Sequence, residues 1–94
     1  MDVRVMIVSN PDETCHVSVL APSPAGRSWG KGYGSKQLCL NELIIVGLLT
    51  PTEAAVSRLN DLEKRDSLLV FNRAIEQDVL SAAGYVEQQS DFVN

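Results

Sequence analysis

The segment with the residue types best suited to contact a charged or aromatic ligand is Arg27-Ser-Trp-Gly-Lys-Gly-Tyr-Gly-Ser-Lys36. It lies in a stretch from Thr14 to Asn41 without acidic residues, although the chain has a formal charge of −4. Basic side chains steer and bind anions, and neighbouring aromatic rings can stack on bases or on groups of a protein partner. The sequence therefore predicts a partner- or ligand-binding site, formed by Arg27, Trp29, Lys31, Tyr33 and Lys36.

Two interpretations of this segment concern phosphate. Ala25-Gly-Arg-Ser-Trp-Gly-Lys31 fits the first seven positions of a phosphate-binding loop, but Gly32 stands where a Ser or Thr hydroxyl would bind magnesium, so a nucleotide triphosphate site is disfavoured. The N–H groups of a helix that begins at Ser35, with Lys31 and Lys36 beside them, could still receive an anion. The favoured alternative is a solvated basic loop, with the two aromatic rings packed on the core.

Residues that commonly perform catalysis are not grouped in this sequence. Cys15 and His16 are neighbours in an expected strand and so point to opposite faces, which keeps them from sharing a metal or forming a nucleophile–base pair. The acidic residues of the C-terminal half fall on the polar sides of expected helices, close to arginines. We therefore expect no catalytic residue, no metal site, no cofactor and no enzymatic activity.

The composition is that of a small folded protein. The 94 residues suffice for one domain, and 45% hydrophobic with 21% charged residues is ordinary for a globular chain. The acidic balance disfavours a general nucleic-acid coat protein, whose phosphate contacts need clustered Lys and Arg. We expect Cys15 and Cys39 to be core thiols without a disulfide. No apolar run is long enough for a signal peptide or membrane span, so a cytoplasmic location is expected.

The N-terminal part alternates with a period of two, which predicts half-buried strands. One strand covers 3–8 and a second covers 15–21, and the turn formers of Asn10-Pro-Asp-Glu-Thr14 join them as an antiparallel hairpin. Pro22-Ser-Pro-Ala-Gly26 ends the second strand. Residues 27–33 then form a third strand or stay a loop.

Helices are expected after Gly34. Ser35 as N-cap and Gly47 after the last turn bound a helix that is buried on most sides. Thr50-Pro-Thr-Glu53 has the form of a capping box and opens a second helix. The apolar stripe of that second helix consists of Ala55, Leu59 and Leu62.

Ser67-Leu-Leu-Val-Phe71 fits either a buried strand or the start of a third helix. The helix is favoured because apolar residues follow at spacings of three and four, with Asp66 as N-cap and Gly84 as the end. As a helix, Leu68-Leu-Val-Phe71 would expose apolar groups around its circumference, and we therefore expect a homodimer.

These patterns predict an α+β fold: an antiparallel two- to three-stranded meander packed by a buried helix and followed by two further helices. The chain is expected to be a single domain, 1–94. Within it, 1–34 form the hairpin and the glycine-rich basic loop, 35–84 the helical half and 85–94 a C-terminal tail. We expect Val17, Leu43 and Ile44 in the core.

The order of these features resembles HicB-type antitoxins over residues 3–46. The resemblance rests on Val17-Ser-Val19, the Pro/Gly turn at 22–26, Gly34 with Ser35 as cap, and Leu40-Asn-Glu-Leu43. It implies two strands that lead through a Pro-Gly turn to a third strand and a helix. We expect a small non-catalytic protein-interaction or regulatory module, antitoxin-like or phage-related, with a protein partner. The alternative is a binder of nucleic acid or a phosphate-bearing ligand through 27–36, with nucleic acid the less favoured partner.

Overall fold

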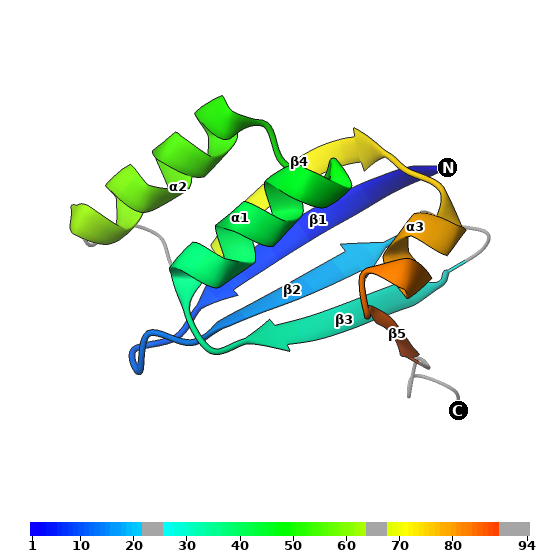
Figure 1. Ribbon diagram of the computed structural model, residues 1–94, viewed down its shortest axis with the longest axis horizontal. Coiled ribbons are helices and arrows are strands. Elements are labelled where there is room, and N and C mark those ends of the chain that lie inside the picture. The colour runs from blue at the N-terminus through cyan, green and yellow to red at the C-terminus, as the bar shows by residue number, and fades with distance from the viewer. Residues whose placement is uncertain (22–25, 64–67, 89–94) are drawn as a thin grey trace.

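A five-stranded antiparallel sheet carries three helices in this α+β protein (Figure 1). The computed structural model describes residues 1–21, 26–63 and 68–88. The elements in chain order are β1 (Asp2–Ser9), β2 (Cys15–Leu20), β3 (Ser28–Tyr33), α1 (Lys36–Val46), α2 (Pro51–Leu62), β4 (Leu68–Ala74), α3 (Gln77–Ala82) and β5 (Val86–Gln88). The sheet is larger than the two- to three-stranded meander predicted from the sequence.

The strand order is β4-β1-β2-β3-β5, so β1, β2 and β3 form a central meander with one later strand at each edge. The predicted hairpin of β1 and β2 is confirmed, with Ile7 opposite Val17. Its turn closes through a hydrogen bond of 2.9 Å from the Asn10 N–H to the Thr14 carbonyl. The alternative left open for 27–33 resolves as a strand, because Ser28–Tyr33 pairs along β2.

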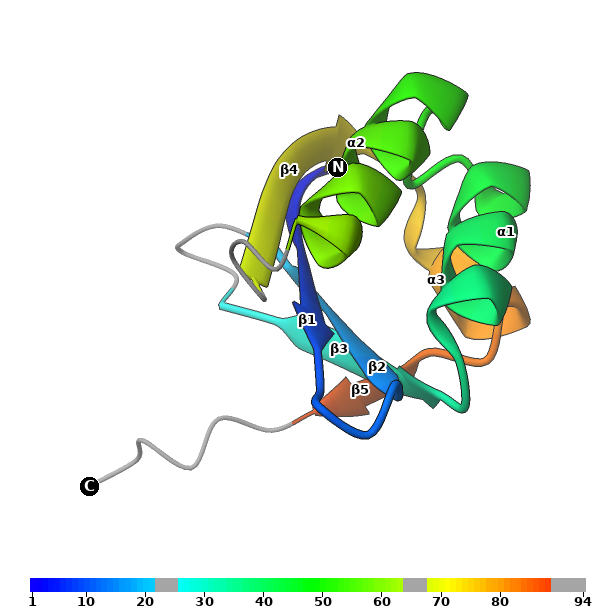
Figure 2. The same ribbon diagram turned by 90° about the vertical axis from the view of Figure 1, so that its left-hand side faces the viewer.

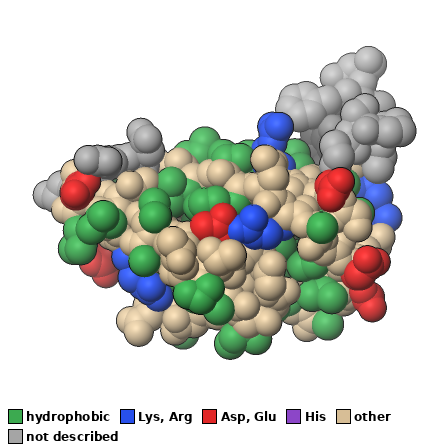
Figure 3. Space-filling model, turned by 90° about the horizontal axis from the view of Figure 1, so that it is seen from above, with side chains coloured by type: hydrophobic (Ala, Val, Ile, Leu, Met, Phe, Trp, Pro, Cys, Tyr) green, Lys and Arg blue, Asp and Glu red, His purple; other side chains and the backbone are tan. Residues whose placement is uncertain are grey.

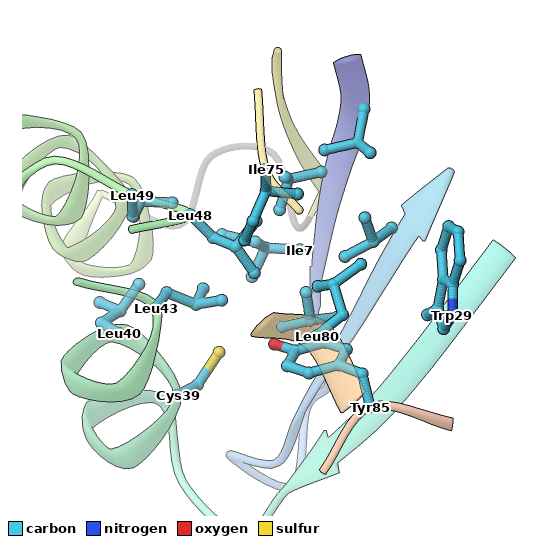
Figure 4. Packing of buried hydrophobic residues seen from close by; sticks show 14 of the residues in the cluster. Ile7, Trp29, Cys39, Leu40, Leu43, Leu48, Leu49, Ile75, Leu80 and Tyr85 are labelled. Carbon is cyan, nitrogen blue, oxygen red and sulfur yellow. The ribbon is translucent and has the colours of Figure 1, made fainter. Parts of the chain in front are cut away.

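The two faces of the sheet differ because strand side chains alternate. The helices lie on one face, which we call the covered face (Figure 2). Side chains of the covered face and of the helices converge between the two layers (Figure 4) and form one core, which includes Val3, Val5, Ile7, Cys15, Val17, Val19, Trp29, Cys39, Leu40, Leu43, Leu48, Leu49, Ile75, Leu80 and Tyr85. No described helix lies on the opposite face, which we call the open face.

Helix α1 has the predicted boundaries. The Ser35 hydroxyl accepts the Leu38 N–H at 3.2 Å, and Gly47 ends the helix at φ 86°, a left-handed conformation that favours glycine. The core assignments of Val17 and Leu43 are confirmed. The third, Ile44, is only partly buried and packs against the margin of the core.

Helix α2 has the predicted capping box but the opposite orientation. Thr50 and Glu53 bond each other's N–H groups, whereas the predicted apolar stripe points outward, with Leu59 54% and Leu62 79% exposed. Ala54 and Ser57 face the core instead. Two ion pairs join α2 to its neighbours in this orientation: Glu53 pairs with Arg73 of β4, and Asp61 pairs with Lys36 of α1. Helical periodicity identifies a stripe but not what it faces.

The prediction of a helix over 67–71 is wrong. Leu68–Ala74 is strand β4, paired with β1 so that Val5 lies opposite Phe71. Only Gln77–Ala82 is helical, and Gly84, at φ 89°, follows it. The expected tail contains the buried Tyr85 and strand β5. The predicted roles of Pro22-Ser-Pro-Ala-Gly26 and of Asp66, and residues 89–94 of the tail, lie largely outside the described residues.

Candidate functional site

Four of the five predicted site residues are turned inward. Arg27, Trp29, Lys31 and Tyr33 occupy alternate positions on or next to β3, on the side of the sheet that faces the helices. The Trp29 ring is 1% exposed and belongs to the core. In this conformation it cannot be the surface anchor that the sequence suggested, and the alternative of core packing holds for Trp29.

Arg27 lies at the margin of this core. Its guanidinium is 5.2 Å from the centre of the Trp29 ring, forms an ion pair with Glu87 of β5, and donates to the Gln77 side-chain oxygen at 2.7 Å. The Glu87 carboxylate raises the pKa of the guanidinium. Arg27 therefore links β3 to β5 and α3.

Lys31 is the centre of a polar cluster under α1. Its ammonium donates to both carboxylate oxygens of Glu42, at 2.8 and 3.0 Å, and to the Ala83 carbonyl at 2.7 Å. The rings of Tyr33 and Tyr85 lie beside it, with their hydroxyls joined by a hydrogen bond of 2.9 Å. Burial opposes ionisation of Glu42, but hydrogen bonds from Lys31 and Tyr33 outweigh it and lower the pKa of the carboxyl. Burial raises the pKa of both tyrosines.

Lys36, the fifth predicted residue, lies apart from this cluster in the first turn of α1. Its ammonium donates to the Ser9 hydroxyl at 2.5 Å and pairs with Asp61 at 3.0 Å. A cation at a helix N-terminus is unfavourable against the helix dipole unless an anion compensates it, and here Asp61 does so. Each cation of the 27–36 segment thus has a carboxylate partner within the chain, so this segment offers an external phosphate no unpaired charge.

Cys15 and Cys39 are free thiols, and both are buried in the core as the sequence predicted. The hydrogen bond with Cys15 and burial both hold the pKa of the Cys39 thiol above its ordinary value, which keeps it neutral. His16 points to the open face, away from both. Within residues 1–21, 26–63 and 68–88, no group of three His, Cys, Asp or Glu residues could hold a metal ion.

The open face is a surface that the sequence analysis did not identify. Strand pairing gives it the following described side chains: Asp2, Arg4, Met6 and Val8 of β1; His16, Ser18 and Leu20 of β2; Ser28 of β3; Leu68, Val70, Asn72 and Ala74 of β4; and Val86 and Gln88 of β5. Gly30 and Gly32 of β3 add no side chain of their own, and the Gln88 side chain lies over Gly30. No described aromatic residue lies on this face, and its only fully charged side chains are Asp2 and Arg4.

A hollow of about 740 Å³ lies at one end of this face. Met6 and Leu20 give it apolar side chains, and Asp2, Arg4, Asn72 and Arg73 add charged and polar groups. The Arg4 guanidinium is exposed and has no ion pair with any described residue. The uninterrupted apolar run Val5-Met-Ile-Val8 puts apolar residues on both faces of β1, and this is the pattern in the sequence that could have revealed the second surface.

The helical layer also exposes hydrophobic side chains, but outside the apolar stripe of α2 they are dispersed. Figure 3, seen from above, shows hydrophobic groups separated by charged and other side chains. The most exposed are Ile45 of α1 and Leu62 of α2, on different helices. Scattered apolar side chains are ordinary on a protein surface, whereas a contiguous hollowed face marks an interaction site.

Among the described helices, none has the length and apolar character needed to cross a membrane. Comparison of the chain with protein families, with curated proteins and with solved structures gives no match. The functional assignment therefore depends on the geometry of the covered and open faces.

Proposed function

We propose that this protein is a small non-catalytic interaction or regulatory module that binds a segment of a partner protein on its open face. The observation that carries the proposal is a hollow that combines the apolar side chains of Met6 and Leu20 with the exposed guanidinium of Arg4, which has no ion pair among the described residues. The acidic side chains of the described helices lie elsewhere. Apolar side chains together with arginine are typical of protein–protein interfaces.

The composition of the open face favours a protein partner over nucleic acid. Sheets that bind single strands present aromatic rings for stacking and several cations for phosphates. Here Trp29, Tyr33, Phe71 and Tyr85 all lie on the covered side, and Arg4 is the one described cation of the open face. The same arrangement gives no support to a phosphate-bearing ligand at 27–36.

The chemistry of the hollow defines the partner segment. Apolar side chains would fill the space above Met6 and Leu20, and a carboxylate would pair with the Arg4 guanidinium. A regulatory role of the antitoxin or phage-related kind, in the cytoplasm, agrees with the resemblance of residues 3–46 and with two reduced core thiols.

The proposal is tested by mapping the contact and then measuring it. A photo-reactive amino acid at Ser18, in the middle of the open face, should cross-link the partner, whereas the same group at Asn41 on exposed α1 should not. The partner is identified from the cross-link and purified for calorimetry. Arg4→Glu should then weaken binding by about tenfold or more, because the new carboxylate would repel the carboxylate of the partner segment.

Arg58→Glu is the matched control, since Arg58 is an exposed residue of α2 and the charge change is the same. It should leave the affinity unchanged. Cross-links formed only from Asn41, or equal losses for both variants, would refute binding at the open face.

A further inference from the structure

The outer edge of β4 has unpaired main-chain groups. Met1 and Ile75 exchange both of their hydrogen bonds, at 3.0 and 2.8 Å. Bonded and non-bonded pairs alternate in an antiparallel ladder, so the odd-numbered residues of β4 bond β1 and the even-numbered ones point their N–H and C=O groups outward. Of these outward groups, the Asn72 carbonyl accepts the Arg73 guanidinium at 2.7 Å. No described strand pairs with the others.

This edge has few of the features, such as prolines and charged side chains, that usually keep an edge strand from pairing with another chain. Leu68–Ala74 contains no proline, lysine or acid, and its one charge, Arg73, pairs with Glu53 of α2 and occupies only the Asn72 carbonyl of the edge. Leu68 and Val70 are 48% and 47% exposed. A seven-residue apolar edge of this kind is a template for another strand.

We propose that β4 pairs antiparallel with β4 of a second copy of this chain, about a two-fold axis at Val70. The two Val70 residues then exchange main-chain hydrogen bonds. Leu68 of each copy does so with Asn72 of the other, where the Leu68 N–H replaces the Arg73 guanidinium as donor to the Asn72 carbonyl. On the covered side, Leu69 lies opposite Phe71 of the other copy, an apolar cross-strand pair. An axis at Phe71 instead would set Leu69 opposite Arg73, which makes Val70 the better centre.

This pairing would also complete the hollow of the open face. Asn72 lines the hollow, and the register sets Leu68 of the second copy directly opposite it, on the same face of the sheet. Each copy would thereby add an apolar side chain to the rim of the other's hollow. The dimer itself needs no partner on the open face, so it goes beyond the proposed function and can be tested separately.

The first experiment measures mass by light scattering at tens of micromolar, where the wild-type protein should have twice the mass of one chain. Val70→Lys sets two ammonium groups opposite each other and should raise the dimer dissociation constant about tenfold or more. Ile45→Lys adds the same charge at an exposed apolar position of α1 and should leave the dimer intact. A monomeric wild-type protein, or a dimer equally weakened by both variants, would overturn the proposal.

Hydrogen exchange of the wild-type protein gives a second test that needs no variant. The amides of Val70 and Asn72 should be protected in the dimer and lose protection on dilution to the monomer, while the Phe71 amide, which faces β1, stays protected in both. A dimer with fast exchange at Val70 would show that another surface is used. If the protein is monomeric yet cross-links through Ser18, this inference fails while the proposed function stands.

Discussion

The two faces of the sheet use the same strands for different purposes. In β3 the alternate residues Trp29, Lys31 and Tyr33 turn to the covered face, where they meet α1, α3 and Tyr85. Their neighbours Gly30 and Gly32 turn to the open face and add no side chain to it. The segment 27–36, although rich in cations and aromatic rings, therefore mainly connects the sheet to the helices. The open face is the better candidate for binding.

The largest difference between the faces should appear when a charge is introduced on each. Val17→Asp buries a carboxylate with no partner at a position with 0% exposure, which costs several kcal/mol, comparable with the total stability of roughly 5–15 kcal/mol of a small domain. The variant should be unfolded by circular dichroism. The adjacent Ser18→Asp, on the open face, should fold and change stability by less than about 1 kcal/mol. Equal effects would mean that the open face is also buried.

Removal of a large side chain should also cost more stability on the covered face than on the open face. Trp29→Ala should lower the free energy of unfolding by about 3–5 kcal/mol, because it leaves a cavity in the core. Leu20→Ala, on the half-buried open face, should cost only about 1 kcal/mol. Denaturant titration measures both values. A Trp29→Ala protein as stable as the wild type would show that the ring is not a core residue.

The smallest effect concerns the polar cluster of the covered face. Lys31→Met leaves the Glu42 carboxylate without its cation and the Ala83 carbonyl without its donor, which should cost about 1–3 kcal/mol. The pKa of Glu42 is lowered in the folded protein. The ionised carboxylate therefore stabilises the fold above its ordinary pKa of about 4.3, and this stabilisation is lost as the pH falls through the pKa of the folded state. Thermal melts between pH 6 and pH 3 measure this loss.

Glu42→Gln is the control for that pH dependence, since it removes the titrating group but keeps a similar shape. Its acid-induced loss of stability should be smaller than that of the wild-type protein. If this variant lost as much stability between pH 6 and pH 3 as the wild-type protein, a group other than Glu42 would cause the pH dependence.

Local interactions explain which parts of the fold the sequence could predict. Ser35, Gly47 and the Thr50–Glu53 box act on neighbours within one helical turn, so the start and end of α1 and the start of α2 follow from the sequence. Leu68–Ala74 differs because its conformation is set by pairing with β1, more than 60 residues away in the chain. Spacings of three and four within one apolar run did not distinguish a helix from such a strand.

The candidate site shows the same limit. Alternation correctly places Trp29 and Tyr33 on one face of a strand, but the sequence does not state whether that face is covered. The partners that decide it, Glu42, Ala83 and Glu87, come from three later segments. The open face required knowledge of the strand order, because its residues are contributed by β1, β2 and β4 together.

The strand order also has a consequence for folding during synthesis. The central meander is complete once residue 33 has left the ribosome, but both outer strands, Leu68–Ala74 and Val86–Gln88, are made much later. Until then, both edges of the meander are open, and Trp29 lacks the strand that pairs beside it. Long-range β pairings form slowly and leave unpaired edges prone to aggregation. The nascent chain should therefore depend on chaperones most strongly between the appearance of β3 and of β4.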